Sequence, residues 1–459
     1  MTAMLARVAP VGYDFHMRVQ GPKELLDAGV RAHQSGRLQE AAQLYDQVLT
    51  FDADNAGALA SLGMLLAEMK QFERAESLLR RALGRTPDRA DAHANLAGVL
   101  HDAHRFAEAI DCCERGLKIA PEHKRLLNTL ASSLSGAERY DEALALLERI
   151  AAANPGYAKA SYFTGMLHAK LGNCDAAVRA FDRATQIDPR DLEAFVSWGE
   201  CLMAHGRAAD ALGPIDRALQ LKVYEVRALA LKTLALAELG RRDEEAWLSD
   251  PHHFVHTFRL ADLGYRAEDI AALNRALADF AANEPSMRED PPEYATYKGW
   301  HTTRNLADYR DDAPSILKQF IAYGFEQRLK SLPNEDPRHP FVRGAPPRFH
   351  LDLWAVKMTS GGKMLPHIHA DGWLSGVYYV EVPAVVCDPA AGQAGWLKVG
   401  GSRSDIPLTR EPITRAVQPE PGLLVTFPSY LWHDTIPLPV ENTERRLCLA
   451  FDLHPRKAG

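Results

Sequence analysis

Three histidines near the C-terminal end have the spacing of a metal site. His367 and His369 are two residues apart in the segment LPHIHA, and His433 follows sixty-four residues after His369. Residues i and i+2 of a β-strand point to the same face, so the first two imidazoles would point together. His433, at the end of a later strand-like run, could supply a third nitrogen from a facing sheet. Three ligands on one face leave open positions at the metal, which is typical of non-heme iron sites.

A carboxylate offers an alternative to the first of these histidines. His369-Ala370-Asp371 spells His-x-Asp, which together with His433 would make a set of two imidazoles and one carboxylate. His369 belongs to both sets. The spacing alone leaves open whether His367 or Asp371 completes the site.

Short strand-like runs surround these histidines and would have to position them. The runs are rich in β-branched and aromatic residues and are bounded by Gly, Pro or Asp. They cover residues 349–358, 365–370, 373–383, 395–400, 423–432 and 445–454. Because no helical pattern interrupts them, we expect a β-sandwich or a jelly-roll barrel.

The region before these strands mixes helix and loop patterns. Residues 260–283 and 313–331 have apolar residues at helical spacing, which predicts two amphipathic helices. The segment KGWHTTRNL (298–306) between them is polar, and residues 334–348 form a proline-rich loop.

One long connection inside the strand region has two interpretations. Residues 384–422 are rich in Gly and Pro and contain Trp396, Arg403 and Asp405. The stretch is either a lid over the site or a plain connection between strands.

The first half of the chain repeats with a period of 34 residues. Only seven of the 28 prolines precede residue 230. One column of the repeat is always alanine: Ala41, Ala75, Ala109, Ala143, Ala177 and Ala211. Twelve positions before it stands a column of small residues: Gly29, Gly63, Ala97, Ala131, Gly165 and Gly199. Twelve positions after it, four repeats have proline: Pro87, Pro121, Pro155 and Pro189. Small residues allow two helices to approach closely and proline ends the second helix, so the period predicts stacked helical hairpins.

This 34-residue period resembles the tetratricopeptide (TPR) family over roughly residues 22 to 225. Ala53 and Val223 stand where the first and sixth repeats would have proline, and residues 226–249 are expected to form one capping helix. The resemblance implies a concave groove that binds a protein or peptide. By repeat position, the residues that would face the groove, or else simply solvent, are Arg125, Asn128, Lys159, Tyr162 and Lys170.

The C-terminal motifs resemble the bacterial Fe(II)/2-oxoglutarate oxygenases that are often fused to TPR arrays. The segments that carry the resemblance are PHIHADGWLSGVYYVEVP (366–383), PGLLVTFPSYLWHDTIP (421–437) and RRLCLAFDLHP (445–455), within a match over roughly 295–455. The resemblance implies a double-stranded β-helix, or jelly-roll, that uses Fe(II), 2-oxoglutarate and O2.

The resemblance also assigns roles to individual residues. His433 aligns with the distal metal ligand and the HxH pair with the proximal motif, where the wider superfamily has His-x-Asp. The position of Asp371 varies among relatives, so His367 is the favoured ligand. Arg446 and Tyr379 align with the residues that hold the far carboxylate of 2-oxoglutarate, a task that suits a planar guanidinium. The segment before the barrel could line the substrate entrance with Trp300, His301, Thr303 and Arg304.

The predicted fold class is multidomain α + β, with an α-solenoid of TPR hairpins before a jelly-roll that has flanking helices. The expected boundaries are an N-terminal segment at 1–21, six repeats at 22–225, the capping helix at 226–249 and an oxygenase domain at 250–459. Within that domain, a helical lead-in covers 250–348 and the jelly-roll core covers 349–455.

Composition and cysteine usage point to a cytoplasmic protein. The 53 basic and 60 acidic residues give a net charge of -7, which is unusual for a dedicated nucleic-acid binder. No run approaches the ~18 apolar residues that a membrane-spanning helix needs, and the first ten residues lack the apolar core of a secretory signal. The six cysteines form no CxxC pair, which favours free thiols in a reducing compartment. We therefore expect no nucleic acid and no membrane among the partners.

The hypothesis that follows is an Fe(II)- and 2-oxoglutarate-dependent dioxygenase that hydroxylates a protein or peptide recruited by the TPR array, with release of succinate and CO2. No side-chain nucleophile is needed. A cupin-type metal protein is one rival, but Trp373 and Leu374 stand where cupins have a glutamate. The other rival is an interaction scaffold with a catalytically silent barrel.

Overall fold

A computed structural model describes residues 21–291 and 295–455. The predicted N-terminal segment at 1–21 lies outside the described residues except for Gly21. The chain divides into two compact units, the first ending at Pro155 and the second beginning at Gly156. The division falls within the repeats and does not coincide with the expected boundary at 249/250.

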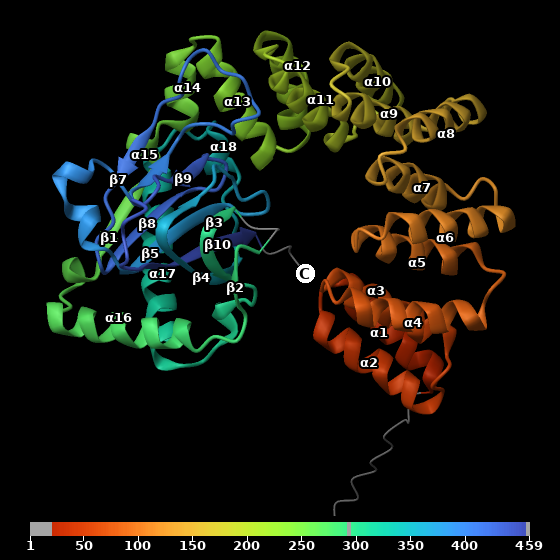
Figure 1. The fold of residues 1–459 in the computed structure, drawn as a ribbon, viewed down its shortest axis with the longest axis horizontal. Helices are drawn as coiled ribbons and strands as arrows, with labels where there is room; N and C mark the ends of the chain where they lie inside the picture. The colour runs from red at the N-terminus through yellow and green to blue at the C-terminus, as the bar shows by residue number, and fades with distance from the viewer. Residues whose placement is uncertain (1–20, 292–294, 456–459) are drawn as a thin grey trace, which may run out of the picture. The chain divides into compact units, whose positions relative to one another are not determined.

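The first unit consists of four helical hairpins (Figure 1). Their helices are α1 Pro22–Gln34, α2 Leu38–Phe51, α3 Ala56–Glu68, α4 Phe72–Arg85, α5 Ala90–Asp102, α6 Phe106–Ile119, α7 Lys124–Gly136 and α8 Tyr140–Ala153. Each pair joins a helix of 13 residues to one of 14 residues. The 34-residue period of the sequence is therefore one hairpin with its two turns.

The small-residue column exists because a bulky side chain fills the space beside it. A Cβ on Gly29 would lie 2.6 Å from the ring of Tyr45, and one on Gly63 would lie 2.8 Å from Leu79. In the second unit, Gly165 meets Phe181 in the same way, at 2.7 Å. The bulky residue always follows the glycine by sixteen positions, so the column sets how closely the two helices of a hairpin pack.

The second unit begins with three more hairpins. Their helices are α9 Ala158–Lys170, α10 Cys174–Ile187, α11 Leu192–Ala204, α12 Ala208–Leu221, α13 Val226–Glu238 and α14 Arg242–Ser249. The expectation of one capping helix over 226–249 is wrong, because the segment forms the two helices α13 and α14. Gly240 separates them in a left-handed conformation with φ 68°, which ends a helix at low cost only for glycine.

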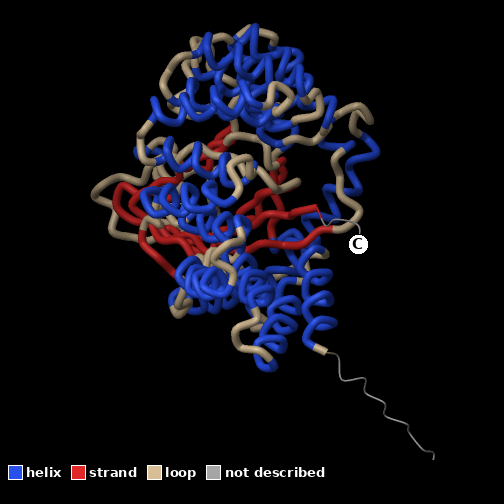
Figure 2. Tube along the Cα trace, turned by 90° about the vertical axis from the view of Figure 1, so that its right-hand side faces the viewer, coloured by secondary structure: helices blue, strands red, loops and turns tan. Residues whose placement is uncertain are grey.

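Antiparallel strands follow the hairpins and gather in one body with flanking helices (Figure 2). The larger sheet has seven strands in the order β1-β8-β5-β10-β4-β3-β2. These are β1 His256–Arg259, β2 Met287–Glu289, β3 Thr296–Thr302, β4 Phe349–Met364, β5 Leu374–Glu381, β8 Leu423–Pro428 and β10 Arg446–Pro455. The smaller sheet, in the order β7-β6-β9, contains β6 Leu397–Val399, β7 Arg415–Val417 and β9 His433–Thr435. Two sheets of this kind are compatible with the predicted jelly-roll.

Two helices cover one face of the larger sheet: α16 Ala267–Ala282 and α17 Asp312–Ser331. Tyr378 of β5 points to this face, where its hydroxyl donates to Oδ1 of Asn274 at 2.7 Å and its ring meets Phe320 edge-on. Successive side chains of a strand alternate between faces, so Tyr379 points to the opposite face. The predicted fold class, a TPR solenoid before antiparallel sheets with flanking helices, is confirmed.

The last repeats and the sheets share one hydrophobic core. The cluster runs from Phe195 of α11 through Leu234 of α13 to Leu453 of β10. Tyr224 strengthens this junction, because its hydroxyl donates to the carbonyl of Trp373 at 2.7 Å. Burial of this common apolar surface explains why the compact unit includes α9 to α14.

Several local expectations from the sequence are wrong. Residues 365–370 do not form a strand and have only an isolated bridge, between His367 and His433. The helix expected over 260–283 begins only at Ala267, because Gly264 with φ 85° ends a preceding 3-10 turn. The polar segment 298–306, for which no element was predicted, forms most of β3 in its first half.

The structure shows the state of the cysteines and whether any helix could span a membrane. All six cysteines are free, as expected. Within 21–291 and 295–455, no helix combines the length and apolar character needed to cross a membrane.

Candidate metal centre

The three predicted histidines come together on one side of a cavity. His433 begins β9, which pairs with β6, and its backbone exchanges two hydrogen bonds of 3.1 Å with His367. The backbone N–H of His369 donates to the carbonyl of Ser429 at 3.2 Å, which fixes the second half of the motif. The three imidazoles lie with ligand nitrogens within 4.8 Å of one another. Backbone hydrogen bonds to two distant residues therefore position the two histidines, a role that the sequence analysis assigned to a regular strand.

The hydrogen bonds of the three rings fix their tautomers. Nδ1 of His367 donates to the carbonyl of Leu365 at 2.7 Å, and Nδ1 of His433 donates to that of Leu431 at 3.0 Å. Nδ1 of His369 donates to Oδ2 of Asp452 at 2.6 Å. With the proton on Nδ1, every ring keeps its lone pair on Nε2.

The lone pairs of two of these rings face each other. Nε2 of His369 and Nε2 of His433 are 3.1 Å apart, and neither carries a proton in the tautomers just described. Two acceptors at this distance repel unless a cation lies between them. A metal ion satisfies both nitrogens, and the fixed second nitrogen is the usual partner arrangement of a metal-binding histidine.

Burial keeps two of the imidazoles neutral, which is the form that binds metal. Desolvation, reinforced by the neighbouring His369, lowers the pKa of His367 to about 3. Desolvation and the two other histidines hold the pKa of His433 well below its usual range. Both rings are therefore available as ligands at neutral pH without the loss of a proton.

Asp452 is a functional candidate that the sequence reasoning missed. It lies on β10, 5% exposed, and its other oxygen accepts from the hydroxyl of Ser375 at 2.6 Å. Burial raises the pKa of Asp452, but its hydrogen bonds with His369 and Ser375 lower it by more, so the net shift is downward. A carboxylate behind a ligand histidine orients the ring and raises its basicity. The only sequence signal was an acidic residue within the otherwise apolar run 447–453.

Asp371, the alternative ligand, lies elsewhere. It is exposed in a turn and does not belong to the group of three histidines whose ligand atoms converge. The turn Ala370–Asp371 directs the chain from the histidine segment into β5, so the residue two positions after His369 is no longer on the same face.

Arg446 and Tyr379 form a second polar group in the same cavity. Arg446 is 2% exposed, and one of its nitrogens lies 3.4 Å from the hydroxyl of Tyr379. Its other contacts are the sulfur atoms of Met358 and Cys448 at 4.0 and 3.7 Å, and its Nε has no hydrogen-bond partner among the described residues. No carboxylate in the described part of the chain pairs with it. A buried guanidinium without an anion is costly, which marks the cavity as a site for an anionic ligand.

Strand register explains why these side chains share one cavity. Cys448 of β10 stands opposite Tyr379 of β5, and Asp452 stands opposite Ser375. Alternation along β10 then places residues 446, 448, 450 and 452 on the face opposite α16 and α17. Both Arg446 and the three histidines line the cavity there.

Comparison with known protein families agrees with this chemistry. Residues 352–452 match the family described as "Putative 2OG-Fe(II) oxygenase". Tetratricopeptide repeat models match residues 32–97, 66–134, 128–191 and 164–225. The chain joins TPR repeats to a domain of this oxygenase family. The family as a whole implies Fe(II), 2-oxoglutarate and O2.

Solved structures similar to the chain include TPR proteins. A tetratricopeptide repeat protein from Parabacteroides merdae is 18% identical, with coverage of 49% of this chain and 89% of that protein and a TM-score of 0.41. YrrB, described as a TPR protein with an unusual peptide-binding site, is 25% identical, with coverage of 42% and 100% and a TM-score of 0.30. PilF of Pseudomonas aeruginosa is 17% identical, with coverage of 45% and 94% and a TM-score of 0.37. Among curated proteins, no sequence matches the chain significantly.

A second hollow of the oxygenase domain opens beside the histidines. It has a volume of about 970 Å³, and His301, Thr303 and Arg304 line it together with His367 and His369. His301 is buried and stacks on Trp354, which in turn stacks on His369. Trp300 is not among its lining residues, and its ring instead lies under the Lys357 ammonium at 3.9 Å.

The long connection of the oxygenase domain is tied to the repeats. Arg403 bonds Glu200 of α11 at 3.0 Å, and the hydroxyl of Thr409 donates to Glu238 of α13 at 2.7 Å. The backbone N–H of Ile413 donates to Glu245 of α14 at 2.6 Å. These contacts favour the interpretation of 384–422 as a connection, which also contributes β6 and β7 to the smaller sheet.

The groove residues expected in the repeats have varied surroundings. Tyr162 is nearly buried, and Lys159 bonds Asp191 at 3.0 Å. Arg125 lies 3.7 Å from Asp91. A hollow of about 790 Å³ opens instead over the first repeats, and Tyr45, Met64 and Asn95 are among its lining residues.

Proposed function

We propose that this protein is an Fe(II)- and 2-oxoglutarate-dependent dioxygenase that hydroxylates a protein or peptide substrate. The observation that carries the proposal is the convergence of three imidazoles with a buried, anion-free guanidinium in one cavity. His367, His369 and His433 would hold the iron through Nε2. Bound Fe(II) would supply the activation of O2 that couples decarboxylation of 2-oxoglutarate to hydroxylation of a C–H bond.

The protein's own residues would position the cosubstrate. Arg446 offers a planar fork that can bind the far carboxylate in bidentate fashion, and the Tyr379 hydroxyl adds one donor. Burial raises the pKa of Tyr379 well above its usual value, so the phenol keeps its proton and can donate. The rest of the cavity wall is largely apolar, with Val356, Val377 and Leu397 excluding water from the site.

The substrate would enter through the hollow beside β3. Because the hollow shares His367 and His369 with the metal cavity, a side chain placed there reaches the iron directly. Thr303 and Arg304 offer polar groups at its wall, which suits the backbone of a peptide. The repeats would supply a separate docking surface, as TPR arrays generally do for proteins.

Anaerobic titration with Fe(II) and 2-oxoglutarate tests the proposal. A keto acid chelated to Fe(II) gives a visible charge-transfer band. We expect this band in the wild type and in Asp371→Ala, and its loss in His369→Ala. Formation of succinate from 2-oxoglutarate in the presence of O2 provides the second measurement. Iron binding without the band and without succinate would overturn the proposal in favour of a cupin-like site, and failure to bind iron would leave a silent barrel.

A further inference from the structure

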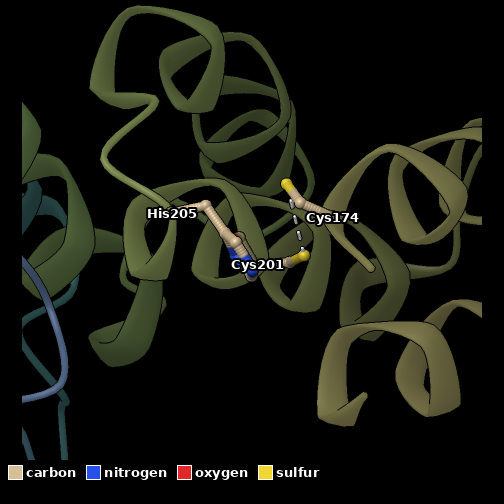
Figure 3. Close-up of side chains that lie close together, drawn as sticks. All are labelled: Cys174, Cys201 and His205. Carbon is tan, nitrogen blue, oxygen red and sulfur yellow. Dashed lines mark hydrogen bonds between the residues drawn. The ribbon is translucent and has the colours of Figure 1, made fainter. Parts of the chain in front are cut away.

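A second group of metal-ligand side chains lies between two neighbouring repeats, outside the oxygenase site. Cys174, Cys201 and His205 have ligand atoms that all lie within 4.8 Å of one another. Figure 3 shows the two sulfur atoms facing each other across the gap between α10 and α11, at 4.0 Å, with the imidazole of His205 beside them. Cys201 is buried, Cys174 is half-buried and His205 is exposed.

The repeat pattern shows that these residue types are specific to this junction. At this junction the first residue of a second helix lies next to two residues of the following hairpin, and the same three sequence positions recur every 34 residues. At the other five junctions the three columns contain only Ser, Ala or larger apolar residues. These are Leu38, Leu65 and Met69; Phe72, Val99 and Ala103; Phe106, Ser133 and Ala137; Tyr140, Leu167 and Leu171; and Ala208, Ala235 and Leu239. Only one junction has exchanged all three for metal ligands, and helix packing does not require that exchange.

The chemistry of the three atoms is that of a thiophilic cation site. Two thiolates and one imidazole are the softer ligands that Zn²⁺ and similar ions prefer to oxygen. Nδ1 of His205 donates to the carbonyl of Cys201 at 2.8 Å, which leaves the ring lone pair on Nε2. This hydrogen bond is the outer-shell contact that commonly orients a ligand histidine.

The charges nearby can accommodate two thiolates and a dication. Arg207 lies 3.9 Å from the sulfur of Cys174 and also bonds Asp175 and Asp210 at 2.9 and 2.8 Å. Its guanidinium places a positive charge beside this sulfur atom. Two thiolates neutralise a divalent ion, so the guanidinium keeps its own carboxylate partners when the metal is bound.

We propose that Cys174, Cys201 and His205 form a binding site for Zn²⁺, with a fourth coordination position open to solvent beside the exposed His205. The bound ion cross-links α10 to α11, two helices of different hairpins. The site adjoins the attachment of the oxygenase domain: Glu200, next to Cys201, bonds Arg403, and Gly206, next to His205, lies against Pro407. Zn²⁺ therefore stabilises the part of the solenoid on which the connection 384–422 rests.

Cobalt substitution distinguishes this site from the three-histidine site. The full-length, reduced, metal-free protein is titrated with Co²⁺ under argon, and the thiolate-to-cobalt charge-transfer absorption in the near ultraviolet is recorded. We expect this absorption in the wild type, in His369→Ala, which removes a ligand of the oxygenase site, and in Cys113→Ser, a buried helical thiol elsewhere in the repeats. Cys174→Ser and Cys201→Ser should lose it, His205→Ala should weaken it, and one equivalent of Zn²⁺ should displace it in the wild type.

Two results would overturn the proposal. One is absence of the absorption in the reduced wild type, and the other is an unchanged absorption in both Cys174→Ser and Cys201→Ser. Circular dichroism checks that each variant is folded. Should the buried Cys201→Ser variant fail to fold, the half-buried Cys174 and the exposed His205 carry the test, and retention of the full signal in both of their variants would contradict the assignment.

Discussion

His369 and Asp452, 83 residues apart in the chain, share a hydrogen bond of 2.6 Å between Nδ1 and Oδ2. Asp452 is held in turn by the hydroxyl of Ser375, which also bonds that of Ser429 at 2.8 Å. The backbone carbonyl of Ser429 accepts from the backbone N–H of His369, which closes this series of hydrogen bonds. His369, one of the three candidate ligands, is thus held through both its ring and its backbone by a closed network of buried polar groups. Removal of any one member would leave a buried polar group of this network without a hydrogen-bond partner.

Asp452→Asn should weaken Fe(II) binding about 10- to 100-fold, because the substitution removes the charge that orients and polarises His369. Fluorescence-monitored Fe(II) titration under anaerobic conditions measures the effect. Asp352→Asn is the matched control, since Asp352 stands opposite Asp452 in the register of β4 and β10 but does not bond to any of the three histidines. Equal affinities for Asp452→Asn and the wild type would contradict the orienting role.

Substitution of His367 and of Asp371 should show which of the two binds the metal. His367→Ala removes one of three converging imidazoles and should abolish stoichiometric Fe(II) binding, whereas the exposed Asp371→Ala should bind iron like the wild type. Iron content after anaerobic reconstitution and desalting is the measurement. The reverse pattern would show that the segment rearranges to bring the carboxylate onto the metal.

Arg446→Met should weaken 2-oxoglutarate binding and leave Fe(II) binding intact. Loss of a buried charge partner costs about 2–5 kcal/mol, so we expect an increase in Kd of roughly 30-fold or more. The charge-transfer band at increasing 2-oxoglutarate concentration measures this Kd. Arg445→Met serves as the control, because Arg445 is exposed and pairs with Glu381 at 2.6 Å. A Kd unchanged by Arg446→Met would rule out the guanidinium as the anchor.

Stability should fall as the pH drops below neutrality, with His256 as one identifiable cause. Nε2 of His256 accepts from Arg328 at 2.8 Å, so the folded ring must be neutral. Burial, reinforced by the Arg328 charge, lowers the pKa of His256 to about 4, against roughly 6.5 in the unfolded chain. Below pH 6.5 the unfolded chain therefore binds a proton that the folded chain does not. The contribution is complete above pH 6.5 and is lost as the pH falls from 6.5 to about 4.

Urea unfolding of the metal-free protein at pH 7.5, 6.0 and 5.0 measures this dependence. His256→Gln keeps an acceptor for Arg328 but does not titrate, so it should lose less stability between pH 7.5 and 5.0 than the wild type. The full difference is about 3.5 kcal/mol, from about 2.5 pKa units at about 1.4 kcal/mol each, and about 2 kcal/mol of it falls between pH 7.5 and 5.0. Parallel pH profiles for the two proteins would contradict the assignment.

The oxygenase domain should not fold without the last repeats. A chain that begins at Gly156 keeps the second compact unit, whereas one that begins at Asp250 loses its part of the shared core. The shorter chain also loses the bonds of Trp373 and Tyr430 to Tyr224 and Leu248, each 2.7 Å long. We expect a cooperative thermal transition by circular dichroism for the longer chain only. A cooperative transition at the same temperature in both would show that the domain is independent.

Short-range patterns determined the repeats and much of the site composition. The 34-residue period alone predicts hairpins, because the Gly29 and Tyr45 columns that pack against each other lie within one repeat. Alternation along one strand likewise separates the buried Arg446 from the exposed Arg445. Both inferences need only the local periodicity of a helix or a strand, which any sequence window displays.

Only the tertiary structure decided how the ligands are held and which candidates belong together. A backbone bridge to His433 holds His367 in a segment that forms no regular strand. A turn places Asp371 away from the three histidines, and Asp452, 83 residues after His369, lies beside it. These relationships depend on the register of β10 between β4 and β5, which all three strands set jointly through the core that they share. No local window contains that register, because a shift of one residue anywhere along the pairing would turn Asp452 to the opposite face.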